Sequence, residues 1–149
     1  MMSFEELFRD EYASTVRLAH LLTGDATGAE DLAQDAFARV RPHFDRLDRP
    51  QAYLRTVTVN VCRNWHRRRS RESVYLQQHG VGPTSVSDAA AELLDVVDRL
   101  PFRQRTVLVL RYWKGASEAE IAQALGCRPG TVKSLHSRAL AQMRGEISK

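Results

Sequence analysis

Residues 117–140 read SEAEIAQALGCRPGTVKSLHSRAL, and this stretch decides the fold of the C-terminal part of the chain. Ser117 precedes Glu120 by three residues, which is the spacing of a capping box that satisfies the free amides at a helix start. Gly126 and Pro129 then mark a tight turn between a short helix and a longer one. This order of elements predicts a helix-turn-helix.

The second of these two helices has two different faces. At about 100° per residue, Val132, Leu135, Ala139 and Met143 lie on one arc and face a core. The opposite arc is cationic and hydroxylic and carries no carboxylate: Lys133, Ser134, Ser137, Arg138, Ala141 and Arg144. Such a helix lies with its N-terminal part in the major groove of DNA, where lysine and arginine reach guanine edges or phosphates. A solvated basic face on an ordinary C-terminal helix explains the arc alone, whereas the turn and the capped helix before it favour DNA contact.

Apolar residues recur at helical spacing in most of the chain. Ser3 with Glu6 forms a second capping box, Thr27 with Glu30 forms a third, and Pro50 is placed as the first-turn proline of a third helix. Three helices therefore fit the first 70 residues, and no stretch alternates as a strand does.

Between these helices and the helix-turn-helix the helical pattern stops and then returns. Residues 72–87 combine turn formers and polar residues without an amphipathic period, which predicts a flexible linker. Helical spacing returns over residues 93–100 and in a helix that opens at Pro101, includes Tyr112 in its apolar set and ends near Gly115. We predict an all-α fold with two small helical domains, residues 1–71 and 88–149, joined by the linker.

The charge of the chain is distributed in blocks. The 149 residues are 43% hydrophobic, which is enough to form a core, and they carry a net charge of +4. Residues 1–50 carry −4, residues 51–71 carry +6, residues 72–100 carry −4 and residues 101–149 carry +6. Two basic blocks between acidic ones indicate two surfaces that meet a polyanion and others that meet a different partner. A chain of this length is too short for a large catalytic fold.

The first basic block lies at the end of the third helix. Residues 63–71 read RNWHRRRSR, and Tyr53, Asn60 and Trp65 interleave aromatic rings and an amide with the arginines. Aromatic rings beside cations suit unpaired bases, through stacking and neutralisation of the backbone. Taken singly, Tyr53 and Trp65 fit core packing equally well, and a solvated helix end is the other interpretation of the arginines.

The second helix carries paired carboxylates. Asp31 and Asp35 lie one turn apart on the same face of the segment EDLAQDAF, residues 30–37. Docking of this face on a basic partner helix explains the pair, and a solvated face is the second interpretation. A magnesium site for nuclease chemistry is the third, but one helix offers no further ligands and no general base.

Other chemistry finds no support in the residues. The five histidines show no ligand spacing with cysteine or acid, Cys62 fits a small buried residue, and no phosphate-binding glycine loop is present. We therefore predict no catalytic residue, no metal site, no cofactor and no small-molecule substrate. No apolar run approaches the ~18 residues that cross a bilayer, and the N-terminus is unlike a signal peptide. We expect a cytoplasmic protein without stable membrane insertion.

Several segments together resemble a known family. These are LLTGD (residues 21–25), AEDLAQDAF (29–37), residues 50–69, Leu100-Pro101, EIA (120–122) and GTVKS (130–134). In this order they resemble the extracytoplasmic-function (ECF, group IV) sigma factors of the sigma-70 family, and especially the short actinobacterial SigE-type branch. The resemblance covers nearly the whole chain.

The resemblance implies a role for each helix. It implies a region 2 helical bundle and a region 4 helix-turn-helix, without regions 1 and 3. Binding to the β′ clamp helices of core RNA polymerase falls on Asp31, Leu32, Gln34, Asp35 and Phe37. Recognition and melting of the −10 element, with one base flipped out, falls on Tyr53, Asn60, Arg63, Asn64, Trp65, Arg67, Arg68, Arg69 and Arg71. Recognition of the −35 element falls on Arg128, Thr131, Lys133, Ser134, Ser137 and Arg138, while the first helices of region 4 engage the β flap.

The expected function is therefore that of a sigma factor. Such a protein is not an enzyme: it directs core polymerase to a promoter, opens the strands only inside the holoenzyme and is usually held by an anti-sigma partner. A stand-alone helix-turn-helix regulator, dimeric on duplex operator DNA, accounts for residues 117–144 but leaves the arginine helix and the acidic helix without a task. A metal-dependent nucleic-acid enzyme built on Asp31 and Asp35 has too few ligands.

Overall fold

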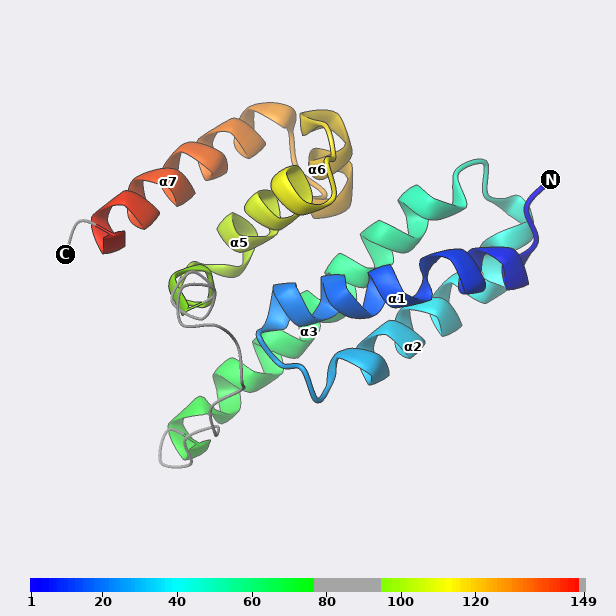
Figure 1. Ribbon diagram of the computed structural model, residues 1–149, viewed down its shortest axis with the longest axis horizontal. Helices are drawn as coiled ribbons and strands as arrows, with labels where there is room; N and C mark the ends of the chain where they lie inside the picture. Colours follow the sequence, from blue (N-terminus) through cyan, green and yellow to red (C-terminus); the bar gives the residue numbers. More distant parts are fainter. Residues whose placement is uncertain (77–94, 148–149) are drawn as a thin grey trace.

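The computed structural model describes residues 1–76 and 95–147. Within these residues the chain forms helices and no strand, so the predicted all-α class is confirmed (Figure 1). The predicted linker beyond residue 76 and the start of the predicted 93–100 helix lie outside the described residues.

The N-terminal unit is a three-helix bundle. Helices α1 (Phe4–Thr23), α2 (Ala29–Val40) and α3 (Pro50–Leu76) pack on one another, with the 3-10 helix η1 (Arg41–Arg46) between α2 and α3. The bundle core is built from large residues without exposed area, such as Leu7, Leu22 and Val40. Burial of such side chains stabilises the bundle by about 1.5–3 kcal/mol each.

The ends of α1 are capped, but the start of α2 differs from the prediction. The Ser3 hydroxyl accepts a hydrogen bond from the Glu6 amide, and Gly24 closes the helix with φ of 75°. The predicted capping box of Thr27 and Glu30 is wrong. The Asp25 carboxylate accepts a hydrogen bond from the Thr27 amide at 3.0 Å, so the chain turns there and Gly28 takes the N-cap position without a side-chain bond.

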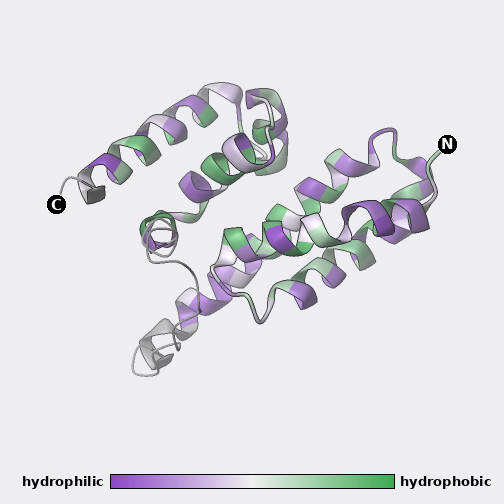
Figure 2. Cartoon of the chain, in the orientation of Figure 1, coloured by the Kyte–Doolittle hydropathy of each residue, from purple (hydrophilic) through white to green (hydrophobic). Residues whose placement is uncertain are grey.

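Helix α3 is longer than predicted. It continues to Leu76, so residues 72–76 belong to a helix and not to the linker. The C-terminal part of α3 extends past the ends of α1 and α2 (Figure 1). That part is coloured mostly as hydrophilic in Figure 2, as expected for the arginine run. The arginines are therefore presented on a projecting helix.

The C-terminal unit contains α5 (Phe102–Leu108), the π-helix η2 (Val109–Trp113), α6 (Glu118–Leu125) and α7 (Pro129–Ile147). The capping box is confirmed, because Ser117 and Glu120 exchange side-chain to backbone hydrogen bonds of 2.9 and 3.1 Å. Tyr112 is 63% exposed, so its predicted place in the apolar set is wrong. The wider π turn, in which the Lys114 amide bonds to the Val109 carbonyl, changes the direction of the residues that follow it.

The two units also contact each other. Helix α6 packs against α3, and buried residues of both units belong to one hydrophobic cluster. The two units therefore pack against each other, with the helix-turn-helix lying against the N-terminal bundle.

Candidate nucleic-acid interface and docking face

Five of the predicted −10 residues lie on one side of α3. Tyr53, Asn60, Asn64, Arg67 and Arg71 are separated by seven, four, three and four residues, which places them on a single face of a helix. Four of the five are exposed and Tyr53 is half-buried. We call these five residues the α3 stripe. It joins an aromatic ring, two amides and two guanidinium groups along one line.

Trp65 lies outside the α3 stripe. Its ring is half-buried against the hydrophobic cluster and meets the His66 ring edge-on, with the ring centroids 5.1 Å apart. The guanidinium carbon of Arg69 lies 5.3 Å from the centroid of the indole ring, within cation–π range. Of the two interpretations open for Trp65, the structure favours packing. Arg68 and Arg69 are exposed on this other side of the helix.

Arg63 lies at the edge of the α3 stripe, and its guanidinium group already has a hydrogen-bond partner. Its Nη2 atom donates a hydrogen bond to the Leu125 carbonyl of α6, at 3.2 Å. The pKa of the Arg63 guanidinium is lowered by burial, and further by the positive charges of Arg67 and Arg103. Arg103 belongs to the C-terminal unit, so both units contribute cations here.

The predicted −35 residues form one exposed surface on the C-terminal unit. Arg128, Lys133, Ser134, Ser137 and Arg138 are exposed, and Thr131 is half-buried. We call these six residues the α7 face. Val132, Leu135 and Ala139 are buried on the opposite side of α7, as their spacing predicts. The α7 face thus presents cations and hydroxyls and includes no carboxylate.

The acidic face of α2 differs in part from the prediction. Asp31 and Gln34 are exposed, and the Asp35 carboxylate pairs with Arg39 of the same helix at 3.2 Å. Leu32 and Phe37 are only 7% and 2% exposed. Their predicted direct contact with a partner is therefore corrected: their side chains fill the bundle core beneath the acidic face.

Two aromatic side chains of α1 extend the acidic face, and the sequence did not single them out. Phe8 is 41% exposed and stacks on Tyr12, with the ring centroids 4.9 Å apart. The Tyr12 hydroxyl accepts a hydrogen bond from Gln34 at 3.4 Å. We call Asp31, Gln34, Asp35, Phe8 and Tyr12 the α2 face. Phe8 shares the helical spacing of the apolar residues of α1, so no signal in the sequence distinguished it from a core residue.

Comparison with known proteins gives the family. Models of sigma-70 region 2 and sigma-70 region 4 match residues 7–72 and 90–143. Over 99% of its length the chain is 38% identical to the RNA polymerase sigma-E factor of Streptomyces coelicolor, and it covers 87% of that protein. The chain is also 34% identical over 91% of its length to the ECF RNA polymerase sigma factor SigL of Mycobacterium tuberculosis, of which it covers 84%. The chain belongs to the ECF sigma factor family.

The fold of this sigma factor is similar to that of a solved relative. The sigma factor RpoE of Bartonella quintana, in complex with the anti-sigma factor NepR, matches with a TM-score of 0.78 at 24% identity, over 97% of this chain and 96% of that one. The matches of the two family models show that the N-terminal bundle is region 2 and the C-terminal unit is region 4. The predicted family and the predicted sigma-factor function are confirmed.

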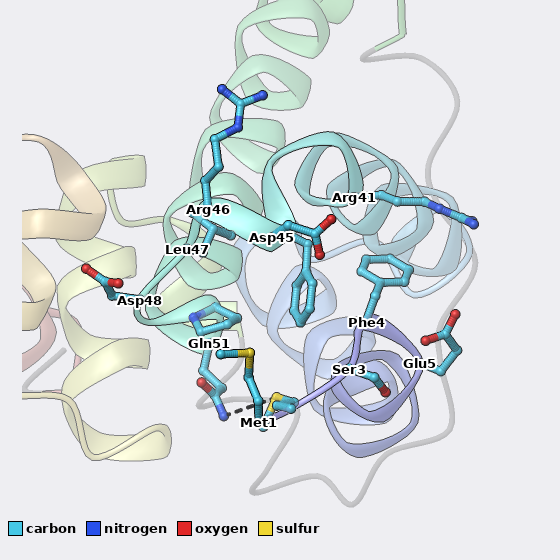
Figure 3. A pocket seen from close by; sticks show the side chains of 13 residues that line it. Met1, Ser3, Phe4, Glu5, Arg41, Asp45, Arg46, Leu47, Asp48 and Gln51 are labelled. Carbon is cyan, nitrogen blue, oxygen red and sulfur yellow. Dashed lines mark hydrogen bonds between the residues drawn. The ribbon is translucent and has the colours of Figure 1, made fainter.

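Two pockets flank the segment that joins α2 to α3 of the sigma factor. The smaller, about 450 Å³, is lined by Leu47, Asp48, Arg49, Ala52, Tyr53 and Thr56, with Gln123 of α6 as a further wall. The larger, about 880 Å³, lies where the N-terminus, η1 and the start of α3 meet (Figure 3). Phe4, Arg41 and Asp45 line it, and none of the predicted site residues does. Only the smaller pocket adjoins the α3 stripe.

An aromatic pair borders the α7 face of the sigma factor and was missed in the sequence. The Tyr112 hydroxyl lies 2.7 Å from His136 Nε2, and the guanidinium carbon of Arg111 lies 5.8 Å from the centroid of the Tyr112 ring. The pKa of His136 is lowered by burial and by the charge of Arg111. His136 lies one turn after Lys133, so this pair lies beside the α7 face and brings the Arg111 cation next to it.

The described part of the sigma factor contains neither a cluster of metal ligands nor a membrane-spanning helix. No three His, Cys, Asp or Glu residues within it are arranged to hold a metal ion. Cys62 has no exposed area, as predicted, and burial raises the pKa of its thiol to about 12. None of the described helices is both long and apolar enough to span a membrane.

Proposed function

We propose that this sigma factor docks on core RNA polymerase through the α2 face, reads and melts the −10 element with the α3 stripe, and reads the −35 element with the α7 face. The observation that carries the proposal is the separation of these surfaces. Two cationic surfaces and one acidic surface occupy three different helices of a single chain. A stand-alone operator-binding regulator would need only the α7 face.

The α2 face suits a basic helix of the polymerase, for which the β′ clamp helices are the proposed partner. Asp31 supplies an exposed carboxylate, whereas Asp35 would exchange Arg39 for a partner cation. Phe8 and Tyr12 add exposed aromatic area, which contributes binding energy at the centre of interfaces. Leu32 and Phe37 support this face from beneath it.

The α3 stripe suits an unstacked strand. Arg67 and Arg71 would neutralise phosphates, while Asn60 and Asn64 offer amide groups to base edges. The pocket beside Tyr53 is adjacent to the stripe and contains an aromatic ring, so it is the proposed place of one flipped base. Stacking of a base on an aromatic ring contributes about 1–3 kcal/mol. This binding offsets the cost of unpairing, so opening needs no ATP and the protein is not an enzyme.

The α7 face suits the major groove of the −35 element. Lys133 and Arg138 would contact guanine edges or phosphates, with Ser134 and Ser137 beside them. The first helices of region 4 would contact the β flap. An anti-sigma protein is a further proposed partner, because the similar RpoE is bound to one in its solved complex. The proposed location of the sigma factor is the cytoplasm.

Pull-down of core polymerase followed by run-off transcription tests the proposal. The wild-type chain is expected to bind core and to start transcripts at defined positions on fragments of its own genome. Binding of duplex DNA without affinity for core would instead support an operator-binding regulator, and magnesium-dependent cleavage would support an enzyme.

A charge-reversal variant tests the α2 face. We expect D31R/D35R to lose core binding by more than about tenfold, because two attractive charges become repulsive. E6R/D10R is the matched control: both residues are exposed carboxylates one turn apart on α1, on the side away from Phe8 and Tyr12. Circular dichroism checks that both variants fold. Equal core affinity of D31R/D35R and the control would refute the docking assignment.

A further inference from the structure

The π-helix η2 carries an aromatic side chain to the surface beside α7. Tyr112 of η2 is 63% exposed, and its hydroxyl lies 2.7 Å from His136 Nε2 of α7. The centroids of the two rings are 5.7 Å apart, and the ring planes meet at 33°. π turns are frequent at functional sites, and this one places a large ring outside the core of region 4. The position of Tyr112 therefore serves the surface and not the packing.

The pair of rings lies at one border of the α7 face. Three residues at about 100° each place His136 about 60° around the helix from Lys133. A helix with its side chains is about 10–12 Å wide, and the major groove of DNA is about 12 Å wide. The borders of the α7 face would therefore lie against the phosphates that line the groove, while its centre lies over the base edges. Tyr112 and His136 thus stand where a phosphate passes.

Two opposite charges act on His136 from the elements that pack around it. Burial and the charge of Arg111 of η2 lower the pKa of His136, and the charge of Glu118 of α6 raises it. Lys133 lies one turn before His136 on α7 itself. Because the charges of Arg111 and Glu118 cancel, the proton of His136 decides whether the rings have a net positive charge beside them.

The hydrogen bond between the rings depends on the same proton. A phosphate oxygen only accepts hydrogen bonds, so Tyr112 can bind one only through its O–H group. When Nε2 of His136 carries no hydrogen, the Tyr112 hydroxyl donates to it and has no further hydrogen to give. An imidazolium instead donates from Nε2 to the hydroxyl oxygen, which leaves the O–H group free for a phosphate. Protonation of His136 therefore supplies both a charge and a donor.

We propose that Arg111, Tyr112 and His136 form a binding site for one backbone phosphate of the −35 duplex, and that His136 takes up a proton when this phosphate binds. The guanidinium of Arg111 is exposed, and its carbon lies 5.8 Å from the centroid of the Tyr112 ring. The proposal rests on the proposed function, because it adds a backbone contact to the same −35 surface. Such a contact fixes the position of α7 in the groove and carries no sequence information directly.

The bound phosphate changes the affinity of His136 for its proton. An opposite charge within about 4–6 Å favours the charged form, so the pKa of His136 is higher in the complex than in the free chain. In the free chain this pKa lies below its ordinary value. Affinity for the −35 duplex is therefore highest below the pKa of the free chain and falls as pH rises through the pKa of the complex.

A binding titration of the −35 duplex across pH tests this linkage. The probe is a fluorescent −35 duplex from the promoter mapped by run-off transcription, and fluorescence anisotropy gives its dissociation constant with the full chain at constant salt. We expect the constant to rise about five- to tenfold between about pH 6 and pH 8 in the wild type. Calorimetry in two buffers with different ionisation enthalpies counts the protons that are taken up on binding.

Two variants separate the proton from the hydroxyl. H136Q removes the titrating group and keeps a side chain that can bond to Tyr112. We expect its dissociation constant to stay level across the pH range, near the wild-type value for pH 8, without proton uptake. Y112F removes only the hydroxyl, so we expect binding at pH 6 to weaken about three- to tenfold and the loss at pH 8 to be smaller.

Two matched controls leave the proposed site intact. H43Q removes an exposed histidine of region 2, so the pH dependence of the wild type is expected to remain. W113F changes the aromatic residue next to Tyr112, whose ring is 38% exposed and has the Lys114 ammonium 5.2 Å from its centroid. We expect W113F to bind the −35 duplex as the wild type does at every pH.

The phosphate site is overturned if H136Q keeps the pH dependence of the wild type, or if the wild-type chain binds without proton uptake. Equal losses in Y112F and W113F overturn it as well, because η2 would then act only as a scaffold. If circular dichroism shows that H136Q has lost helix, Y112F and the proton count decide. Binding of the −35 duplex without proton linkage leaves the proposed function intact, whereas no binding at any pH overturns both.

Discussion

Arg105 is the residue on which the contact between the regions depends most. A buried guanidinium is costly unless hydrogen bonds and an opposite charge compensate for the loss of water. Arg105 meets this requirement with three backbone carbonyls and with the Asp98 carboxylate at 3.6 Å. Burial lowers the pKa of Arg105 and raises the pKa of Asp98, and the pairing of their charges opposes both shifts. Arg105 and its carbonyl and carboxylate partners therefore compensate one another for the water that each loses on burial.

His66 makes this cluster sensitive to acid. Burial lowers the pKa of His66, the bond to the Leu22 carbonyl raises it, and the charge of Arg105 lowers it again. The folded chain thus binds this proton more weakly than the unfolded chain, so the contribution of His66 to the free energy of unfolding is present above pH ~6.5 and is lost as pH falls below it. Arg69 and Asp98 also face the imidazole with opposite charges, and the rings of Trp65 and Phe102 pack on it.

We expect H66Q to flatten the decline of stability between pH 7 and 5.5, measured by urea unfolding. The control is H43Q, because His43 is an exposed imidazole of the same region, and His136 stays in both proteins. Asp98, with its raised pKa, adds stability as pH falls further, so the measurement ends at pH 5.5. The same pH dependence in both variants would contradict the role of His66.

Residue types predicted which side chains are exposed better than they predicted which side chains contact a partner. Lys133, Ser137 and Arg138 are exposed on α7 as the acid-free arc indicates. Leu32 and Phe37 were assigned to docking through the family resemblance, although both share the helical spacing of the buried Ala36 and Val40. The spacing of apolar residues predicts which side chains are buried. A family resemblance assigns a function to a whole segment, in which some side chains can point into the core.

At the scale of elements, helix ends decide how the regions approach each other. Gly24 and Gly126 end α1 and α6 with φ of 75° and 68°, a conformation that costs a residue with a Cβ about 1–2 kcal/mol. Their surroundings differ. A Cβ on Gly24 would lie 3.0 Å from the Asp98 carboxylate of region 4, whereas a Cβ on Gly126 would meet nothing within 4 Å.

We therefore expect G126A to lower the free energy of unfolding by about 1–2 kcal/mol through the backbone alone. G24A is expected to lose more than G126A, because Asp98 must also move, and to gain in radius of gyration as the regions separate. Chemical denaturation and scattering measure the two effects. A smaller loss of unfolding free energy in G24A than in G126A would show that Asp98 does not restrict a side chain at the end of α1.

Helix positions were predictable, and their irregularities were not. Caps and prolines predicted the starts of α1, α3 and α6, because these signals act within a few residues. The start of α2 was misplaced because the Asp25 carboxylate accepts the Thr27 amide that a capping box would have given to the Glu30 side chain. The π turn of η2 has no sequence signature, so the exposure of Tyr112 and Trp113 could not be foreseen.

At the scale of the whole molecule, the alternating charge blocks correspond to separate surfaces, but the contact between the regions was not predicted. The contact uses the Leu22 and Leu125 carbonyls, and a backbone carbonyl leaves no trace in a sequence. The cations that meet them, Arg105 and Arg63, belong to basic blocks that composition assigns to DNA. A sequence reports charge, and only the structure reports which partner each charge has.

Salt dependence can separate the two basic surfaces. Each phosphate that a protein neutralises steepens the fall of log K with log salt by about 0.9 on duplex DNA and about 0.7 on a single strand. R67A/R71A removes the two exposed cations of the α3 stripe and none of α7. Filter binding over a salt series should show the promoter slope of the holoenzyme falling by up to about 1.4 units, while the slope of the free chain on the −35 duplex stays the same. The free chain provides the control because its α7 face alone contacts that duplex. An equal fall of both slopes would mean that α3 and α7 bind DNA as one continuous surface.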